Sequence, residues 1–370
     1  MSPKTKATQP AGTSHRGGTA PTDPRVHVRP LRAVDLGRCA ELLAGLHARA
    51  QSTGPRGMLR GLAYLSAGGC RGLLDGLLAS PRATGVVAEV DGRVQGFLIG
   101  ERQLFAPEDF ASIYAEPRSV AVPLHGHAVE EGEDGVLLYR LMYAQLASAW
   151  VDAGFFVHNV SVHAGDAAAL EAWAMLGFGR KSACAARPTA AHGKQAAAVA
   201  GVGIEEIRGR DDEVLEQSHR RLMRFQAGAP IFWPYSGESD ARVRDVRREA
   251  LEGGRGFALV AREATTGAAL GSLLFVPAIF LPPMLAADSV VYLWEGFVED
   301  DQRAAGVGSM LLERAMELVH AQGIAWCALH YVTANPRGGR FWPSRGFVAV
   351  EYTLCRRVDE RALWHRGPLA

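Results

Sequence analysis

The chain has 370 residues, a length that predicts two or three domains rather than one small module. Its 40 Lys and Arg residues nearly balance 39 Asp and Glu residues, and the net charge of +1 argues against partners recruited by bulk positive charge, such as nucleic acids or membrane surfaces. Hydrophobic residues make up 48% of the chain and charged residues 21%, which is typical of a soluble globular protein with a sizeable core.

The cysteines predict neither a disulfide framework nor a structural zinc site, because they form an odd set without a C-x-x-C pair. They are Cys39, Cys70, Cys184, Cys327 and Cys355. We therefore expect a reducing, cytoplasmic setting and no metal.

Two segments resemble targeting or membrane sequences at first sight. Residues 1–24 are rich in Pro, Gly, Thr and Lys and lack the apolar core of a secretion signal, so we expect a disordered tail. The uncharged segment from Gly267 to Ala287 approaches the length of a membrane span. Its prolines, at 277, 282 and 283, would break a helix, which favours a strand that enters a loop.

The chain from Arg25 onward predicts alternating strands and helices. The expected elements are a strand over Val26 to Leu31, a helix capped by Asp35, a hairpin over Gly85 to Gly100 that turns at Asp91-Gly92, a strand over Ser119 to Leu124, a helix over Gly135 to Ala153, a strand over Phe155 to Val162 and a short helix to Leu176, before Gly177-Phe178.

The same plan then restarts after an alanine-rich segment. The expected elements are a strand over Val202 to Ile207, a helix opened by Asp211 and Asp212, a hairpin over Gly256 to Val276 that turns near Thr265-Thr266-Gly267, a strand over Ser289 to Val298, a helix over Ser309 to Gln322, a strand over Ile324 to Tyr331 and a short helical stretch before Gly346-Phe347.

One constant offset relates the two Gly-Phe pairs, and it also relates Trp173 to Trp342 and Asp166 to Asn335. Because the order of elements repeats as well, we infer an internal duplication. The expected organisation is a tail at 1–24, a first domain at 25–184, a linker at 185–201, a second domain at 202–360 and a short tail at 361–370.

The most informative motif is R-x-x-G-x-G, between an apolar strand that ends at Val298 and an amphipathic helix. Gly306 and Gly308 remove side chains where backbone N–H groups at a helix start can approach a diphosphate, and the helix dipole favours that anion. Arg303 can add a charge-assisted contact. The alternative is an ordinary glycine turn with a solvated arginine.

In this context the chain resembles the GNAT superfamily of CoA-dependent N-acyltransferases. The V-x-x-x-x-R-x-x-G-x-G arrangement at 298–308, the following helix and strand, Asn335 and the closing F-W-P-S-R-G-F at 341–347 lie in the order of that family. At the same offset, the first half has Asp134, Leu137 and Tyr139 in place of Arg303 and the two glycines, so it resembles the same fold with its diphosphate turn lost. The fold class implied is α/β (α+β): two tandem GNAT-like domains, each a mixed, twisted sheet flanked by helices.

The resemblance implies that the fourth and fifth strands splay apart and that the pantetheine arm of acetyl-CoA inserts between them. Phe297 and Val298 would pair with the pantetheine amides, Asn335 would lie near the arm, and Trp342 would flank the thioester. The residues implied to hold the pyrophosphate are Arg303, Ala304, Ala305, Gly306, Val307, Gly308 and Ser309.

Glu295 is the first candidate for the base that accepts a proton from the attacking amine. Strand alternation predicts that its side chain shares a face with Val291, Leu293 and Phe297, where apolar neighbours raise a carboxyl pKa. Similarly placed acids serve as bases in many members of the resembled family. The alternative is a structural ion pair with Arg340 or Arg345.

His330 is a second candidate base or relay because the ordinary pKa of histidine lies near neutrality, although a lone histidine can equally be structural. The resembled family often carries a tyrosine that protonates the departing CoA thiolate where this chain has Trp342, and an indole cannot serve as that acid. Tyr331 or Tyr352 can substitute, or both can be packing residues. Trp342 can likewise be a core residue.

Together these features predict an N-acetyltransferase that moves an acetyl group from acetyl-CoA to a primary amine, either a small molecule or a peptide, by direct attack in a ternary complex. We expect no metal, no nucleic acid, no membrane partner, and a monomer or homodimer. The alternatives are a non-catalytic acyl-CoA sensor or interaction protein, motivated by the missing tyrosine, and an acyltransferase that uses another acyl-CoA. The aromatic segment from Phe232 to Tyr235 would either cover the substrate or pack against the other half.

Overall fold

The computed structural model describes residues 25–53, 66–132, 134–190, 198–210, 212–235, 237–238, 240–278, 281 and 289–366. The expected tail at 1–24, Asp211 and most of the expected loop after β10 therefore lie outside the described residues.

The first half of the chain contains seven strands and four α-helices among the described residues. They are β1 (Val26–Pro30), α1 (Leu36–Thr53), α2 (Ala67–Leu78), β2 (Ala83–Val90), β3 (Arg93–Leu104), β4 (Arg118–Val122), β5 (His127–Val129), α3 (Gly135–Asp152), β6 (Val157–His163), α4 (Ala167–Met175) and β7 (Gly179–Pro188). Short 3-10 helices cover Ala33–Asp35 (η1) and Phe110–Ile113 (η3).

The second half contributes six strands and four α-helices to the described part of the chain. They are β8 (Val202–Ile207), α5 (Glu213–Ala227), α6 (Asp240–Glu252), β9 (Phe257–Glu263), β10 (Ala269–Pro277), β11 (Val290–Val298), α7 (Val307–Ala321), β12 (Trp326–Val332), α8 (Gly338–Ser344) and β13 (Val348–Arg357). Short 3-10 helices cover Asp300–Gln302 (η5) and Glu360–Arg366 (η6).

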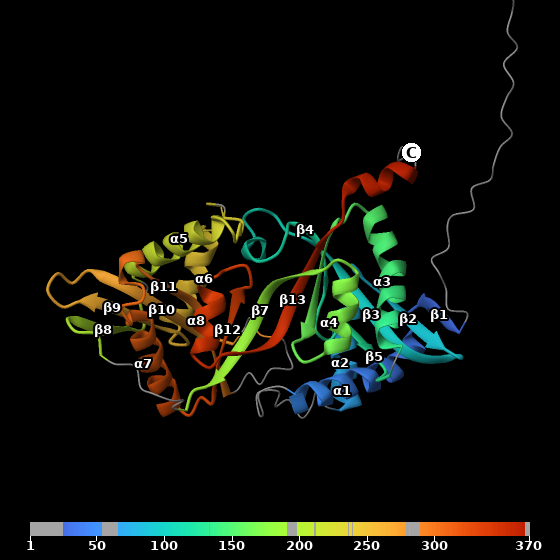
Figure 1. Cartoon of the computed structure of the whole chain (residues 1–370), viewed down its shortest axis with the longest axis horizontal. Coiled ribbons are helices and arrows are strands. Elements are labelled where there is room, and N and C mark those ends of the chain that lie inside the picture. Colours follow the sequence, from blue (N-terminus) through green and yellow to red (C-terminus); the bar gives the residue numbers. More distant parts are fainter. Residues whose placement is uncertain are drawn as a thin grey trace, which may run out of the picture.

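One continuous sheet runs through both halves, because they exchange their last strands. Its order, for the residues described, is β1-β2-β3-β4-β6-β13-β7-β12-β11-β10-β9-β8, with β5 paired to β3. The last strand of the second half, β13, pairs with β6, and the last strand of the first half, β7, pairs with β12. Figure 1 shows β7 and β13 as the long strands that cross the middle of the molecule. Each half is therefore completed by the other.

The exchanged elements follow the repeat seen in the sequence. The offset that relates Trp173 to Trp342 also carries both ends of β6 onto β12 and both ends of β7 onto β13. Asp166 and Asn335, which the same offset relates, both cap a following helix: Asp166 Oδ1 accepts from the N–H of Ala169, and Asn335 Oδ1 accepts from the N–H of Gly338. The mixed α/β fold with two similar halves agrees with the expected fold class.

Helices cover both faces of this sheet. In the first half α1 and α2 pack on one face with Val87, Phe97 and Ile99, while α3 and α4 pack on the other face with Leu98 and Val120. In the second half α7 packs with Leu273, Phe275 and Leu293 on one face, and α5 and α6 cover the opposite face. Because successive side chains of a strand point to opposite faces of the sheet, the strands supply apolar side chains to the helices on both faces.

A buried arginine holds the exchanged strand β7 against the second half. Arg187 is 1% exposed; its Nη1 donates to Glu313 Oε1 of α7 at 3.1 Å and to the carbonyl of Arg345 at 2.9 Å. Two partners compensate part of the cost of burying the guanidinium.

Two details of the sequence analysis require correction. The expected linker begins too early, because Ala185 to Pro188 form the end of β7, where pairing with β12 satisfies their backbone groups. Asp35 does not cap α1 directly. It ends the 3-10 turn before that helix, accepts from the N–H of Arg32 and pairs with Arg29.

The uncharged segment begins as strand β10, which pairs with β9 and β11. Among the described residues, the structure contains no helix of the length and apolar character that a membrane crossing requires.

Candidate functional site

The two central parallel strands of the second half separate after a short contact. β11 and β12 pair only at Val290–Trp326, Val291–Cys327 and Tyr292–Ala328, although both strands continue beyond this point. From Leu293 onward, the residues of β11 therefore pair with no residue of β12. The backbone groups of this part of β11 border an opening between the two strands. This agrees with the splayed strands implied by the resemblance.

A β-bulge re-aims the side chains of β11 at this opening. Leu274 of β10 lies opposite Glu295 and Phe275 lies opposite Leu293, so Trp294 is the extra residue of the bulge. Val291 and Leu293 pack toward α7, whereas Glu295 lies on the α5 side. The prediction that Glu295 shares a face with Val291 and Leu293 was therefore wrong, because a bulge shifts the alternation by one residue.

Glu295 pairs with a buried histidine of α5. Its Oε1 lies 2.7 Å from Nδ1 of His219, whose side chain is 3% exposed, and Nε2 of His219 lies 3.8 Å from Oδ1 of Asp240. Burial favours the neutral ring, but the attraction of Glu295, its hydrogen bond and Asp240 together raise the pKa of His219 above its ordinary value. The expected alternative, an ion pair with Arg340 or Arg345, is replaced by this histidine.

His219 is not among the residues predicted from the sequence. The signal was its position on the buried stripe of α5, between Leu215 and Met223 at a spacing of four residues. A titratable residue on an apolar helix face requires a buried partner, and only the fold identifies that partner as Glu295.

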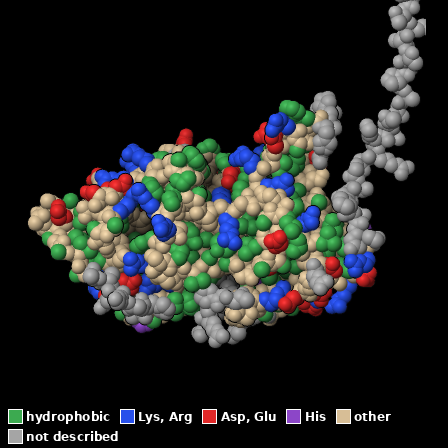
Figure 2. Space-filling model, viewed as in Figure 1, with side chains coloured by type: hydrophobic (Ala, Val, Ile, Leu, Met, Phe, Trp, Pro, Cys, Tyr) green, Lys and Arg blue, Asp and Glu red, His purple; other side chains and the backbone are tan. Residues whose placement is uncertain are grey.

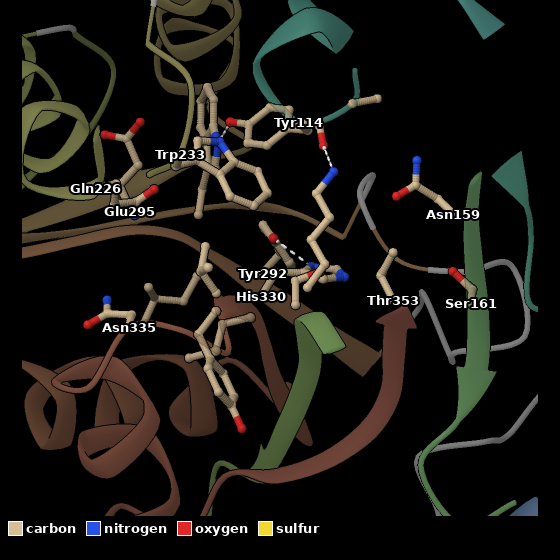
Figure 3. A pocket seen from close by; sticks show the side chains of 18 of the residues that line it. Tyr114, Asn159, Ser161, Gln226, Trp233, Tyr292, Glu295, His330, Asn335 and Thr353 are labelled. Atoms are coloured by element: carbon tan, nitrogen blue, oxygen red, sulfur yellow. Dashed lines mark hydrogen bonds between the residues drawn. The ribbon is translucent and has the colours of Figure 1, made fainter. Parts of the chain in front are cut away.

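A cavity of about 490 Å³ lies where the two halves meet at the opening between β11 and β12. The cavity is lined by residues of α5, β6, β7, β11, β12 and β13. The lining residues include Glu295, His330, Tyr331, Asn335 and Trp342. Figure 3 shows Glu295 and Gln226 at one side and Asn159, Ser161 and Thr353 at the other, with Tyr292 and His330 between them.

The loop after α5 closes part of this cavity and also joins the halves. Trp233 lines the cavity, and its Nε1 donates to the carbonyl of Ile113 in the first half at 2.7 Å. Phe232, in contrast, is 73% exposed. The segment thus both contacts the cavity and packs against the other half.

His330 is hydrogen-bonded through Nδ1 to the hydroxyl of Tyr292 at 2.8 Å. Burial lowers the pKa of His330 to about 4 and raises the pKa of Tyr292 well above its usual range, so both groups are neutral near pH 7. This environment favours the structural alternative for His330 over a base with the ordinary histidine pKa. Tyr331 lines the cavity and packs against the core beside α7.

The glycine turn has the backbone that its sequence predicts. Ala304 has φ +66°, and Gly306, the residue before α7, has φ +93°, a value that favours glycine. A Cβ at Gly306 would lie 3.5 Å from Val199 Cγ2, and a Cβ at Gly308 would lie 3.4 Å from Val298 Cγ2. The turn thus opens a 15-residue helix with two residues that carry no side chain of their own.

Arg303 lies at the start of this turn and is held by several groups. Its Nε donates to the carbonyl of Val298 at 3.0 Å, and Nη1 pairs with Asp300. The guanidinium also lies over the rings of Phe225 and Phe297. On the face drawn in Figure 2, positively charged side chains border a hollow in the half of the molecule that contains α5 and α7.

Asn335 and Trp342 lie at the same opening. Asn335 Oδ1 accepts from the N–H groups of Arg337 and Gly338, so it caps α8 while its residue lines the cavity. A Cβ at Gly296 would lie 3.4 Å from Cη2 of Trp342. The indole therefore lies beside the backbone of β11 at Gly296, and the tighter contact of such a Cβ would be with Leu273, at 3.0 Å.

In the first half, side chains fill the corresponding space. His127, Tyr139 and Trp173 occupy the positions equivalent to Gly296, Gly308 and Trp342, and all three are completely buried. Nδ1 of His127 lies 3.0 Å from the hydroxyl of Tyr139, and the Tyr139 and Trp173 rings are 5.8 Å apart. The first half thus has the rings of His127 and Tyr139, which pack together, where the second half has Gly296 and Gly308.

Within the described residues, no group of three or more His, Cys, Asp and Glu side chains is arranged to hold a metal ion.

Comparison with known proteins identifies the fold. No family model matches the sequence, and no curated protein matches it. A solved GCN5-related N-acetyltransferase from Sphaerobacter thermophilus aligns with a TM-score of 0.55 and 15% identity, over 90% of this chain and 96% of that chain. A tandem GNAT protein from the clavulanic acid biosynthesis pathway aligns with a TM-score of 0.47 and 17% identity, over 93% of this chain and 100% of that chain. The first of these alignments confirms, at the level of the fold, the GNAT resemblance seen in the sequence.

Proposed function

We propose that this chain is a CoA-dependent N-acyltransferase that transfers an acetyl group from acetyl-CoA to a primary amine in the cavity beside β11 and β12. The fold shared with N-acetyltransferases supports acyl transfer in general. One observation supports the proposal most strongly: three features lie at the same opening. They are the separation of β11 from β12, the bulge in β11, and the carboxylate of Glu295 with its buried partner His219.

The second half fits CoA, whereas the first half does not. Residues 303–309 would hold the diphosphate through the N–H groups at the start of α7 and the charge of Arg303. The backbone of Phe297 and Val298 would pair with the pantetheine amides, and Asn335 and Trp342 would flank the arm. The rings of Tyr139 and Trp173 fill the equivalent space of the first half.

Acyl transfer here needs a neutral amine, and alkyl ammonium groups have a pKa of about 10. In the proposed reaction the amine nitrogen bonds to the thioester carbonyl carbon, the C–S bond breaks, and the proton lost by the amine moves to Glu295, directly or through water. Backbone N–H groups of β11 at the bulge would stabilise the oxyanion. His219 is a positioning residue, since it holds the Glu295 carboxylate toward the cavity.

The departing thiolate needs no strong acid, because a thiol has a pKa of about 8.5. Trp342 has no acidic proton to donate. The tyrosines that line the cavity are Tyr114, Tyr292 and Tyr331, and Tyr352 is not one of its lining residues. Instead, Arg180 lies 4.1 Å from the centre of the Tyr352 ring.

A titration of the full chain with CoA tests the binding half of the proposal. We expect one site per chain, because the rings of Tyr139 and Trp173 fill the part of the first half that is equivalent to the glycine turn of α7. Isothermal titration calorimetry measures the stoichiometry directly. Two equivalent sites would contradict the assignment of CoA to the second half.

Thiol release from acetyl-CoA across a panel of amines tests the catalytic half. Amine-dependent release with a mass-spectrometric acetyl product is the expected result. The second candidate function, a non-catalytic acyl-CoA sensor, is favoured by Trp342 and Trp173, which leave neither half with the usual tyrosine. CoA binding without release by any amine would support the sensor.

Replacing His330 by Gln distinguishes a base from a neutral hydrogen-bonding group. Because burial lowers the pKa of His330 to about 4, the ring is neutral across pH 6–8 and a weak base. We expect His330→Gln to lower kcat by about tenfold or less and to leave the pH–rate profile between pH 6 and 8 unchanged. Loss of a pH-dependent limb in this range would instead identify His330 as the base.

A further inference from the structure

The cavity has a second end, built mostly by the first half, which the proposed chemistry does not use. Three hydroxyl residues lie in one register row across neighbouring strands: Ser161 of β6 pairs with Thr353 of β13, and Thr353 pairs with Ser182 of β7. All three line the cavity. We call them the hydroxyl row. It exists only because the halves exchange strands, since β13 brings Thr353 between the other two.

Asn159 lies near the hydroxyl row and adds the buried oxygen of its side-chain amide to this end of the cavity. The residue is 9% exposed and lines the cavity, and its Nδ2 donates to Glu116 Oε2 at 3.1 Å. That bond fixes the orientation of the amide, so Oδ1 is the remaining acceptor. Among the described residues Oδ1 has no hydrogen-bond partner. In Figure 3 it points toward the interior of the cavity.

A buried amide oxygen without a partner destabilises the protein, and a ligand that donates a hydrogen bond to it removes this cost. In the hydroxyl row, Ser161 already binds the carboxyl group of Glu351. Thr353 and Ser182 line the cavity, and a hydroxyl can both donate and accept a hydrogen bond. This end therefore offers uncharged hydrogen-bonding groups to a ligand.

The cavity-lining Lys181 is already matched by Glu116. Nζ of Lys181 lies 2.9 Å from Oε1 of Glu116, and it also donates to the carbonyl of Tyr114. Although burial alone would raise the pKa of Glu116, the attraction of Lys181 lowers it below its usual value, which favours the carboxylate. A carboxylate on a ligand would find Lys181 already occupied, and an ammonium group would find Glu116 already occupied.

We propose that the hydroxyl row and Asn159 bind uncharged hydroxyl groups of the acceptor, and hence that the acceptor is a hydroxylated amine of the amino-sugar or amino-alcohol class. This inference rests on the proposed function for the position of the amine, which lies at the Glu295 side of the same cavity. An acceptor that spans both sides presents its nitrogen to Glu295 and its hydroxyls to the first half. The first half thus determines acceptor specificity.

A matched set of amines tests the hydroxyl requirement. The probes are D-glucosamine, cyclohexylamine, which has a six-membered ring without hydroxyls, and 4-aminocyclohexanecarboxylate, which carries a charge. Acetylation is followed by thiol release with the full chain and acetyl-CoA. We expect kcat/KM for glucosamine to exceed that for each of the other two by roughly tenfold to hundredfold, because unmatched polar groups in the cavity penalise them. Equal or better use of either of the others overturns the inference.

Two variants assign the preference to the proposed residues. Thr353→Val is isosteric and removes one hydroxyl, and Asn159→Leu removes the amide at similar volume. Each is expected to raise KM for glucosamine by roughly tenfold and to leave KM for cyclohexylamine within about twofold. Thr266→Val, in the turn between β9 and β10 and away from the cavity, is the matched control and should change neither value. Equal changes for both amines overturn the inference.

Binding measurements separate this inference from the proposed function. Ligand-observed NMR with CoA present measures binding of glucosamine and cyclohexylamine without turnover. If no amine releases thiol but glucosamine still binds more tightly in a Thr353-dependent manner, the acceptor site stands and acyl transfer fails. If thiol is released but neither binding nor turnover favours the hydroxylated amine, acyl transfer stands and the inference fails.

Discussion

Replacing Glu295 by Gln is expected to reduce kcat/KM for amine acetylation by roughly 10²- to 10⁴-fold, the range typical for loss of a general base. The substitution keeps the size of the side chain and its place opposite His219, but an amide cannot accept the proton of the amine. Steady-state thiol release with a reactive amine measures the effect. CoA affinity should stay within about threefold, because Glu295 lies away from the glycine turn.

A matched surface substitution separates loss of the base from a general effect of removing a carboxylate. Glu249→Gln, the same chemical change on the exposed surface of α6, is the control and should leave kcat/KM unchanged. A variant at position 295 with normal activity would exclude Glu295 as the base.

The same substitution has an effect on stability whose sign follows from His219. Since the folded pKa of His219 is raised, protonated His219 and its bond to Glu295 contribute stability fully below about pH 6.5, the ordinary pKa of histidine. This contribution disappears as pH rises through the raised pKa. We expect Glu295→Gln to lower the free energy of unfolding by about 2 kcal/mol at pH 5.5, and by less at pH 8.5, in urea denaturation.

Local sequence features predicted local structure accurately. The pair Asp91-Gly92 predicted a two-residue hairpin turn, and both residues adopt the positive φ values, +50° and +77°, that such a turn requires. The glycine pattern at 306–308 likewise predicted a turn that opens a helix. In each case the information lies within a few residues, and the backbone preference of glycine decides the geometry.

Features that depend on distant partners could not be derived in the same way. Neither β7 nor β13 was predicted from the sequence, and nothing in either segment indicates that it pairs with the other half. The bulge at Trp294 changes the face of Glu295 without any local glycine or proline signal at that residue. His219 lies 76 residues from Glu295 in sequence. These contacts arise from packing of the whole sheet, so the partner of the catalytic candidate and the first-half wall of the cavity required the fold.

Gly308→Tyr is expected to weaken CoA binding at least about 100-fold, because it installs the residue that the first half carries at the equivalent position. A Cβ at 308 would already be in ordinary contact with Val298 at 3.4 Å and Phe341 at 3.5 Å, so a larger ring has to extend over the start of α7. There it would cover the N–H groups that the diphosphate requires. In the first half the ring of Tyr139 is accommodated by a hydrogen bond to His127, whereas the second half has Gly296 in that place.

Calorimetric titration with CoA measures this loss, and thermal unfolding followed by circular dichroism verifies that the variant is folded. Gly308→Ala is the matched control. Its methyl group fits at the distances found, and alanine favours the helix, so affinity should remain within a few-fold of the unmodified protein. If Gly308→Tyr is folded and binds CoA normally, the diphosphate does not bind at this turn. If only the tyrosine variant loses binding, the residue at position 308 is enough to account for the difference between the halves. The helix start then binds the cosubstrate where this residue is glycine, and the equivalent position of the first half packs an aromatic cluster where it is tyrosine.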